Sequence, residues 1–202
     1  MKMSKIIIGG MRVKDRSSAV EVFRHAIDAG FNYIDTSPCY CYQDDQENSE
    51  TWIGQALSAP GYRDRVMIST KCAPGNGGMG LGEFDPKGFG VRSAEQLRQV
   101  FATSCQRLGI DHLDYYHLWT THTMEQLNEA FKPGGWLEGV MSVKNQWDHL
   151  GITTHADSDT IIRFLETGTF ETVTLPLNVV NTTRLQAAKW AVGKGIGVIA
   201  MN

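Results

Sequence analysis

Residues 30–40 read GFNYIDTSPCY, and this stretch contains the strand and the loop of a helix–strand–loop unit from which the predicted fold is built. Gly30 ends a segment whose apolar positions Val20, Phe23 and Ile27 recur at helical spacing. Residues 31–35 form a β-prone run that ends in an acidic side chain. A polar stretch that includes Tyr40 follows the run. The unit is therefore a helix, a strand and a loop with ionisable side chains.

Similar units recur along the whole chain. Six further strands are predicted at Ile6–Ile8, Arg65–Lys71, Leu113–Leu118, His149–Thr153, Thr172–Leu175 and Gly197–Met201. Helices are predicted at Ser49–Leu57, Met124–Phe131, Leu137–Asn145, Ser158–Thr167 and Thr182–Lys194, with two more capped by Ser17 or Ser18 and by Ser93. The helix that Ser93 caps ends at Gly109. Alternating strands and helices are typical of a parallel sheet with crossover helices, so we expect one α/β domain over residues 1–202.

The glycine pattern argues against a doubly wound dinucleotide-binding fold. Gly9 and Gly10 follow the first strand, but no third glycine completes a phosphate-binding turn. The glycine-rich stretch 74–90 lacks the GKS or GKT of a phosphate-binding loop. We interpret it as a long loop.

Composition excludes several classes of protein. The chain has 19 Lys and Arg against 22 Asp and Glu, a net charge of −3, which provides no basic surface for nucleic acid or an anionic membrane. Its apolar runs are too short for a transmembrane helix or a signal-peptide core, so we expect a cytoplasmic protein. Cys39, Cys41, Cys72 and Cys105 lack the paired spacing of a metal site. We expect free thiols and no bound metal.

Ionisable residues end three of the predicted strands. Asp35 and Lys71 close two of them, and His117 lies near the end of a third. Because the carboxyl ends of parallel strands lie on one face, these side chains could converge there with Tyr40. A lysine beside a phenol lowers the pKa of that phenol, so Tyr40 would become a usable acid, with Asp35 orienting Lys71. His117 would donate a hydrogen bond to a carbonyl oxygen.

The same residues carry a family resemblance. Residues 30–40, followed by Ser49-Glu50 and a helix, resemble the aldo-keto reductase signature, in which an Asp and a Tyr five residues apart precede a Ser-Glu pair. The stretches ISTK (68–71), RLGIDHLDYYH (107–117) and LGITTH (150–155) resemble later blocks of that family in the same order. The resemblance covers nearly the whole chain.

The resemblance implies an NADPH- or NADH-dependent oxidoreductase on a (β/α)8 TIM barrel. In this family a hydride passes from the nicotinamide to the carbonyl carbon of a small aldehyde or ketone, which becomes an alcohol. The family's catalytic Asp, Tyr, Lys and His match Asp35, Tyr40, Lys71 and His117. Tyr42 is a second candidate for the acid, two residues out of register.

Contacts to the cofactor are implied at four positions. Thr154 and His155 stand where many relatives carry Ser-Asn, and Thr174 stands where a Gln is common. Met201 occupies a position at which an aromatic residue often stacks on the nicotinamide.

The length of the chain conflicts with a complete barrel. Eight βα units typically take about 250 residues, whereas this sequence has 202 and seven predicted strands. We therefore expect a C-terminally truncated barrel of seven strands that binds the cofactor weakly or not at all.

Two other functions remain open. The chain could be a catalytically weak, cofactor-binding regulatory protein. It could also be an aldolase-like barrel enzyme in which Lys71 forms a Schiff base. Asp35 argues against the aldolase because a carboxylate keeps Lys71 protonated. The sequence predicts neither the substrate nor the oligomeric state.

Overall fold

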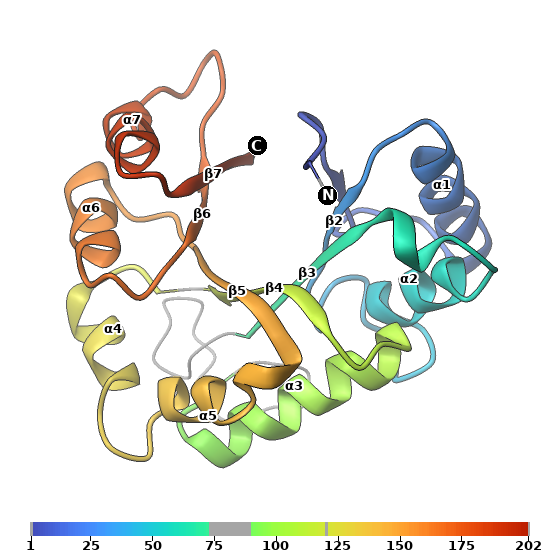
Figure 1. Ribbon diagram of the computed structural model, residues 1–202, viewed down its shortest axis with the longest axis horizontal. Coiled ribbons are helices and arrows are strands. Elements are labelled where there is room, and N and C mark those ends of the chain that lie inside the picture. Colours follow the sequence, from blue (N-terminus) through green and yellow to red (C-terminus); the bar gives the residue numbers. More distant parts are fainter. Residues whose placement is uncertain (1, 73–89, 120, 202) are drawn as a thin grey trace.

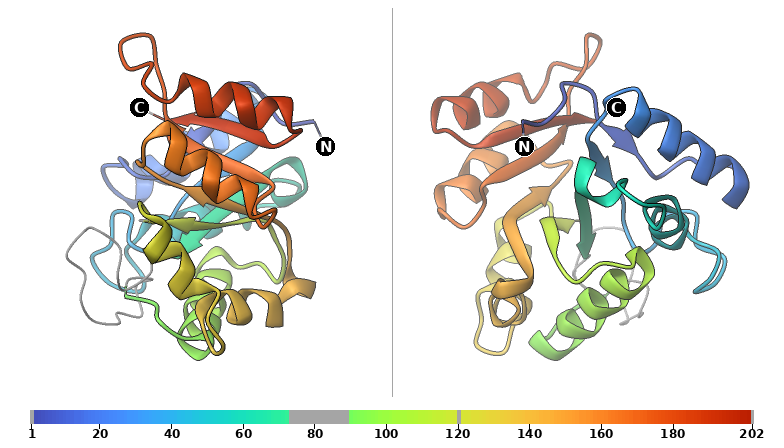
Figure 2. Two further views of the ribbon diagram at one scale, coloured as in Figure 1. Left: turned by 90° about the vertical axis from the view of Figure 1, so that its left-hand side faces the viewer. Right: turned by 45° about the vertical axis from the view of Figure 1, so that its right-hand side comes forward.

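A computed structural model describes residues 2–72, 90–119 and 121–201, and these form a curled parallel sheet with helices on its outer face (Figure 1). The strands are β1 (Ile8–Gly9), β2 (Tyr33–Asp35), β3 (Met67–Cys72), β4 (Leu113–Trp119), β5 (Trp147–Thr153), β6 (Thr172–Pro176) and β7 (Gly197–Met201). Their order in the sheet is their order in the sequence. The described residues thus form seven strands of a (β/α)8-type barrel, as predicted, with β1 and β7 as its edges (Figure 2).

The helices are α1 (Arg16–Asp28), α2 (Ser49–Leu57), α3 (Ala94–Leu108), α4 (Met124–Ala130), α5 (Trp136–Ser142), α6 (Ser158–Glu166) and α7 (Leu185–Gly193). Two short 3-10 helices, η1 (Arg63–Arg65) and η2 (Lys144–Gln146), precede β3 and β5. Helix α3 begins and ends as predicted. The Ser93 side chain accepts a hydrogen bond from the Gln96 backbone amide, and the Gly109 backbone has a left-handed conformation at the C-terminal end. The α1 cap is Asp15, whose carboxylate accepts from the Ser18 amide, rather than Ser17 or Ser18.

The first strand differs from its prediction. It comprises Ile8 and Gly9, which pair with Ile34 and Asp35, whereas Ile6 lies outside it and is exposed. The strand is at an edge of the sheet, where only one neighbour specifies its extent. The other six predicted strands are confirmed, with ends that shift by no more than two residues. Residues 73–89 of the predicted glycine-rich loop lie outside the described residues.

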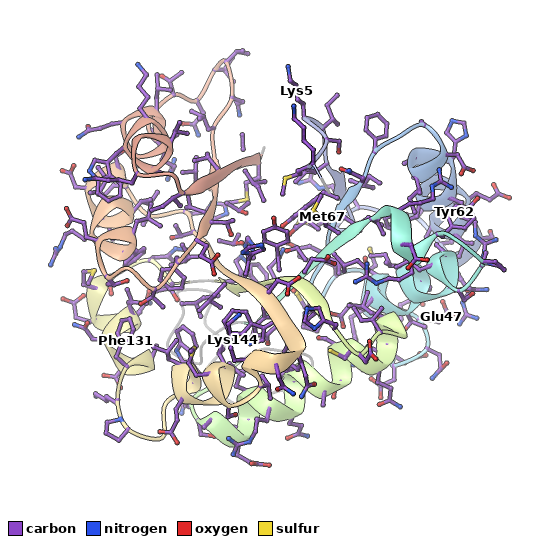
Figure 3. The ribbon with its side chains drawn as sticks, viewed as in Figure 1. Lys5, Glu47, Tyr62, Met67, Phe131 and Lys144 are labelled. Carbon is purple, nitrogen blue, oxygen red and sulfur yellow. The ribbon has the colours of Figure 1, made fainter. Side chains whose placement is uncertain are left out.

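Successive side chains of each strand alternate between the helices and the barrel interior. Outward residues such as Ile68 and Tyr116 belong to the main core beneath the helices. Inward residues Tyr33, Met67 and Ile199 form a second, smaller cluster (Met67 is labelled in Figure 3). The inward side chains near the carboxyl ends of β2, β3 and β4 include Asp35, Lys71 and His117, which are charged or polar. None of the described helices combines the length and apolar character needed to cross a bilayer.

The close approach of α2 to α3 generates a stability prediction. A Cβ at Gly54 would collide with the backbone carbonyl oxygen of Arg107 and would lie 2.9 Å from the carbonyl carbon of Leu108. We expect Gly54→Ala to lower the free energy of unfolding by about 1–3 kcal/mol, because rigid backbone cannot yield to the added methyl. The control is Gly193→Ala in α7, where a Cβ meets no atom within 4 Å and alanine favours the helix. Urea unfolding followed by circular dichroism tests both, and equal effects would contradict the prediction.

Candidate active site

A cavity of about 320 Å³ lies at the carboxyl ends of the strands, between the two edges of the sheet. Its apolar wall comes from both edges and includes Ile7, Met11, Ile199 and Met201. The polar side chains that line it are those of Arg12, Asp35, Tyr40, Thr153 and Thr174. This is the end at which barrels of this class carry their active sites. No group of three His, Cys, Asp or Glu side chains suited to a metal occurs among the described residues.

Asp35 of β2 and Lys71 of β3 form a buried ion pair beside this cavity. The Lys71 Nζ donates to both carboxylate oxygens of Asp35, at 2.7 and 2.8 Å. The Lys71 side chain is fully buried and that of Asp35 is 17% exposed. The Ser69 hydroxyl donates a further hydrogen bond to Asp35 at 3.1 Å. The structure therefore brings together two of the four expected catalytic residues and fixes their relative orientation.

Tyr40 reaches the same cavity from the loop after β2. Its ring packs edge-on against Trp119 at 6.0 Å, and the Lys71 Nζ lies 5.3 Å from its centroid. Burial raises the pKa of Tyr40 and the negative charge of Asp35 adds to this, so the direction is opposite to the one expected from the sequence. Removal of the phenol from water is the larger cause, and the ammonium of Lys71 donates its hydrogen bonds to Asp35. Tyr40 consequently retains its proton at neutral pH, as a proton donor must.

Tyr42, the alternative acid, does not line the cavity. Its hydroxyl donates to Asp45 at 3.2 Å, and the guanidinium of Arg107 lies 5.2 Å from its ring centroid. The structure therefore brings Tyr40, and not Tyr42, to the Asp35–Lys71 pair.

His117 is fully buried, and both of its ring nitrogens have hydroxyl partners. Nδ1 lies 3.0 Å from Thr153 Oγ1, and Nε2 lies 3.3 Å from Thr172 Oγ1. Burial, followed by the positive charge of Lys71, lowers the pKa of His117 to about 3. The imidazole is therefore neutral at physiological pH. His117 is absent from the cavity wall, whereas its partner Thr153 is part of it.

The four expected cofactor contacts divide into two pairs. Thr174 and Met201 line the cavity. Thr154 does not, because its hydroxyl donates to the Thr121 carbonyl at 2.6 Å and accepts from the Ala156 amide at 3.1 Å. His155 is exposed outside the lining residues.

The sequence analysis missed Thr153, although the strand period could have identified it. Thr153 lies two residues after Gly151, so the two share the inward face of β5. Thr154 belongs to the opposite face. Thr153 therefore lines the cavity, whereas the expected contacts Thr154 and His155 do not.

A buried polar network that the sequence analysis also missed secures the loop that carries Tyr40. Arg107 of α3 donates to Asp45 at 2.6 Å, to the Pro38 carbonyl at 3.4 Å and to Glu50 at 3.5 Å. Glu50 is fully buried and accepts from Thr70 Oγ1 at 2.6 Å. The loop after β2 is thus attached to α2, α3 and β3.

Comparison with known proteins identifies relatives of this chain. Residues 5–155, more than half of the chain, match the model of the aldo/keto reductase family. The NADH-specific methylglyoxal reductase of Escherichia coli is 35% identical over 105 residues, which are 50% of this chain and 31% of that protein. The aldo-keto reductase YhdN of Bacillus subtilis is 28% identical over 128 residues, 58% of this chain and 35% of that protein. The matched stretches thus span about a third of these relatives' length.

Solved structures of the same family share the fold. An aldo-keto reductase from Bacillus halodurans, in its holo form, superposes with a TM-score of 0.74 at 19% identity, over 98% of this chain and 61% of that one. An aldo-keto reductase from Klebsiella pneumoniae in complex with NADPH gives a TM-score of 0.68 at 20% identity, over 98% of this chain and 63% of that one. These similarities support the barrel architecture.

The buried ion pair leads to a prediction about stability. Asp35→Asn leaves the ammonium of fully buried Lys71 without a counter-charge, so we expect a loss of about 3–5 kcal/mol in unfolding free energy. The double variant Asp35→Asn with Lys71→Met removes both charges and should recover most of the loss. Urea unfolding of the parent, both single variants and the double variant measures the coupling. Additive effects would show that the pair is not coupled.

The neutral His117 leads to a prediction about pH. Its pKa of about 3 lies below the ordinary value of 6.5, so on acidification the unfolded chain binds the proton before the folded chain does. This contribution to stability is complete above pH 6.5 and is lost as the pH falls toward 3. At pH 5 the loss should be about 2 kcal/mol. His117→Gln, which cannot titrate, should show a correspondingly smaller decrease between pH 7 and 5, and an unchanged decrease would contradict the assignment.

Proposed function

Because the chain belongs to the aldo/keto reductase family, we propose that it is a nicotinamide-dependent oxidoreductase that reduces an aldehyde or ketone to an alcohol. The single observation that carries this proposal is the cavity in which Tyr40 lies beside the buried Asp35–Lys71 pair. An acid that retains its proton, next to a fixed positive charge, suits protonation of an oxygen on which negative charge develops.

The cavity has features that suit a nicotinamide and a small carbonyl compound. Its volume of about 320 Å³ is within the usual range of small-molecule sites, and its wall is largely apolar with a few polar groups. The Thr174 hydroxyl is buried, lines the cavity and has no hydrogen-bond partner among the described residues. An amide could satisfy that hydroxyl. Either NADH or NADPH fits this reasoning, since both carry the same nicotinamide.

Tyr40, Lys71 and Asp35 each have a definite part in the proposed reaction. Thr174 and Met201 are among the residues that would hold a dihydronicotinamide, which would supply a hydride for the carbonyl carbon. Tyr40 transfers its phenolic proton to the carbonyl oxygen as the C–O double bond becomes single. The ammonium of Lys71 stabilises the tyrosinate that remains, and Asp35 orients Lys71 through two hydrogen bonds. Solvent then returns a proton to Tyr40.

An aldolase-like role for Lys71 is less consistent with the geometry. A Schiff base requires a neutral amine that can reach a carbonyl carbon. The Nζ of Lys71 instead donates to both oxygens of Asp35 and is fully buried. Borohydride trapping with a labelled aldehyde should therefore leave Lys71 unmodified.

The proposed reaction can be tested by measuring turnover of matched tyrosine variants. Methylglyoxal is a suitable first substrate because the name of one relative specifies it. With NADH or NADPH in excess, to offset the weak cofactor binding expected of a seven-stranded barrel, we expect this chain to oxidise the cofactor in the presence of methylglyoxal. Tyr40→Phe should lower kcat by at least about 100-fold because the acid is lost. The control is Tyr42→Phe, which removes a phenol outside the cavity and should leave kcat within about three-fold. A Tyr40→Phe variant as fast as the parent would disprove the role of Tyr40 as acid.

A further inference from the structure

The loop that carries Tyr40 does not hold its conformation through local preference. Cys41, the next residue, has a φ of 53°, in the left-handed region that residues other than glycine rarely adopt. A backbone of this kind persists only where the surrounding structure imposes it. The Tyr40 carbonyl accepts from the Ser49 amide at 2.9 Å, and the Cys41 thiol donates to the Met11 carbonyl at 3.3 Å. Contacts from outside the loop therefore set the position of the phenol.

Arg107 of α3 supplies such contacts on both sides of Tyr40. Its Nη1 donates to the carbonyl of Pro38, two residues before Tyr40, at 3.4 Å. Its guanidinium lies 5.2 Å from the ring centroid of Tyr42, two residues after Tyr40, and its Nη2 donates to the Asp45 carboxylate at 2.6 Å. The Arg107 side chain is only 5% exposed, so these contacts hold it in place.

The same guanidinium is connected to the strand that carries Lys71. Nη1 lies 3.5 Å from a carboxylate oxygen of Glu50, which is fully buried, and Glu50 accepts from Thr70 Oγ1 at 2.6 Å. Thr70 directly precedes Lys71 in β3. A buried carboxylate and a buried guanidinium each require the other as counter-charge, so neither can move away without a large cost. Arg107 therefore links the loop of the acid to the strand of the lysine.

We propose that Arg107 is a positioning residue for proton transfer, which sets the place of the Tyr40 phenol relative to Lys71 and the cavity. The inference rests on the proposed reductase function. Arg107 is not among the residues that line the cavity, so it acts through the loop and touches neither substrate nor cofactor. A displacement of about 1 Å at a reacting group can lower kcat by about 100-fold, so the loss of a remote contact is sufficient to affect the rate.

Arg107→Lys tests this positioning with the charge retained. Lysine keeps a counter-charge for Glu50, so the chain should fold, but a compact ammonium cannot reproduce the planar fork that joins Pro38 and Asp45. With the cofactor in excess, we expect kcat for methylglyoxal to fall by about 10- to 100-fold. The KM for methylglyoxal should change by less than about three-fold, because the contacts that are lost do not involve the substrate.

A matched control lies on the same helix. Arg98 is on the surface of α3, where it donates to Glu95 at 2.7 Å, and none of its described hydrogen bonds reaches the Tyr40 loop. Arg98→Lys should leave kcat within about two-fold of the parent. Circular dichroism and urea unfolding establish that both variants are folded. A kcat for Arg107→Lys equal to that of the parent, or an equal loss in Arg98→Lys, would overturn the proposal.

The position of the phenol can also be measured without turnover. Burial raises the pKa of Tyr40, so a change in its surroundings changes the pH at which it ionises. Carbon-13 NMR of chains labelled at the tyrosine Cζ follows this titration, and the signal missing from Tyr40→Phe identifies the residue. At pH 10, the ordinary pKa of tyrosine, we expect Tyr40 to be protonated in the parent and in Arg98→Lys. In Arg107→Lys it should be partly ionised, because water reaches the phenol of a displaced loop.

The two measurements separate the inference from the function on which it rests. A parent chain without turnover would contradict the reductase function, while the tyrosine titration would still decide whether Arg107 positions the phenol. Identical Tyr40 titrations in the parent and in Arg107→Lys would overturn the positioning role and leave the reductase function intact.

Discussion

The buried ion pair of Asp35 and Lys71 is the interaction on which the rest of the site depends. A fully buried ammonium is tolerated only where a carboxylate meets it at hydrogen-bonding distance, and here both carboxylate oxygens do so. That requirement constrains the relative positions of β2 and β3 near their carboxyl ends. It also places the negative charge of Asp35 beside Tyr40, where it adds to the effect of burial in raising the pKa of that phenol.

A second constraint is the space between neighbouring strands. Lys71, His117, Gly151, Thr172 and Gly197 are paired in register across β3 to β7. The two glycines alternate with larger side chains, so the imidazole can lie over Gly151 and reach Thr172 on the strand beyond. His117, Thr153 and Thr172 of the interior are therefore joined by hydrogen bonds.

The sequence predicted those features that depend on local patterns. Strand and helix order, the glycine end of α3 and the convergence of Asp35, Lys71 and Tyr40 all follow from periodicity and from the parallel arrangement of strands. It could not predict which atoms meet. The pKa of Tyr40 is raised chiefly by burial of its phenol, which depends on packing between distant segments. Likewise, the register of β5 decides which of the two adjacent threonines, Thr153 or Thr154, lines the cavity. The attachment of the Tyr40 loop by Arg107 joins residues about sixty positions apart, which no local pattern indicates.

The order of the strands also affects how such a chain can fold during synthesis. Among the described residues, each strand pairs only with the strands made just before and just after it. Every newly emerged strand and helix can therefore dock on an edge that already exists, without waiting for a distant segment. When strands are added in the order of synthesis, only short chain segments have to close into loops, which favours rapid folding. At each stage the most recently made strand is an exposed edge of the sheet.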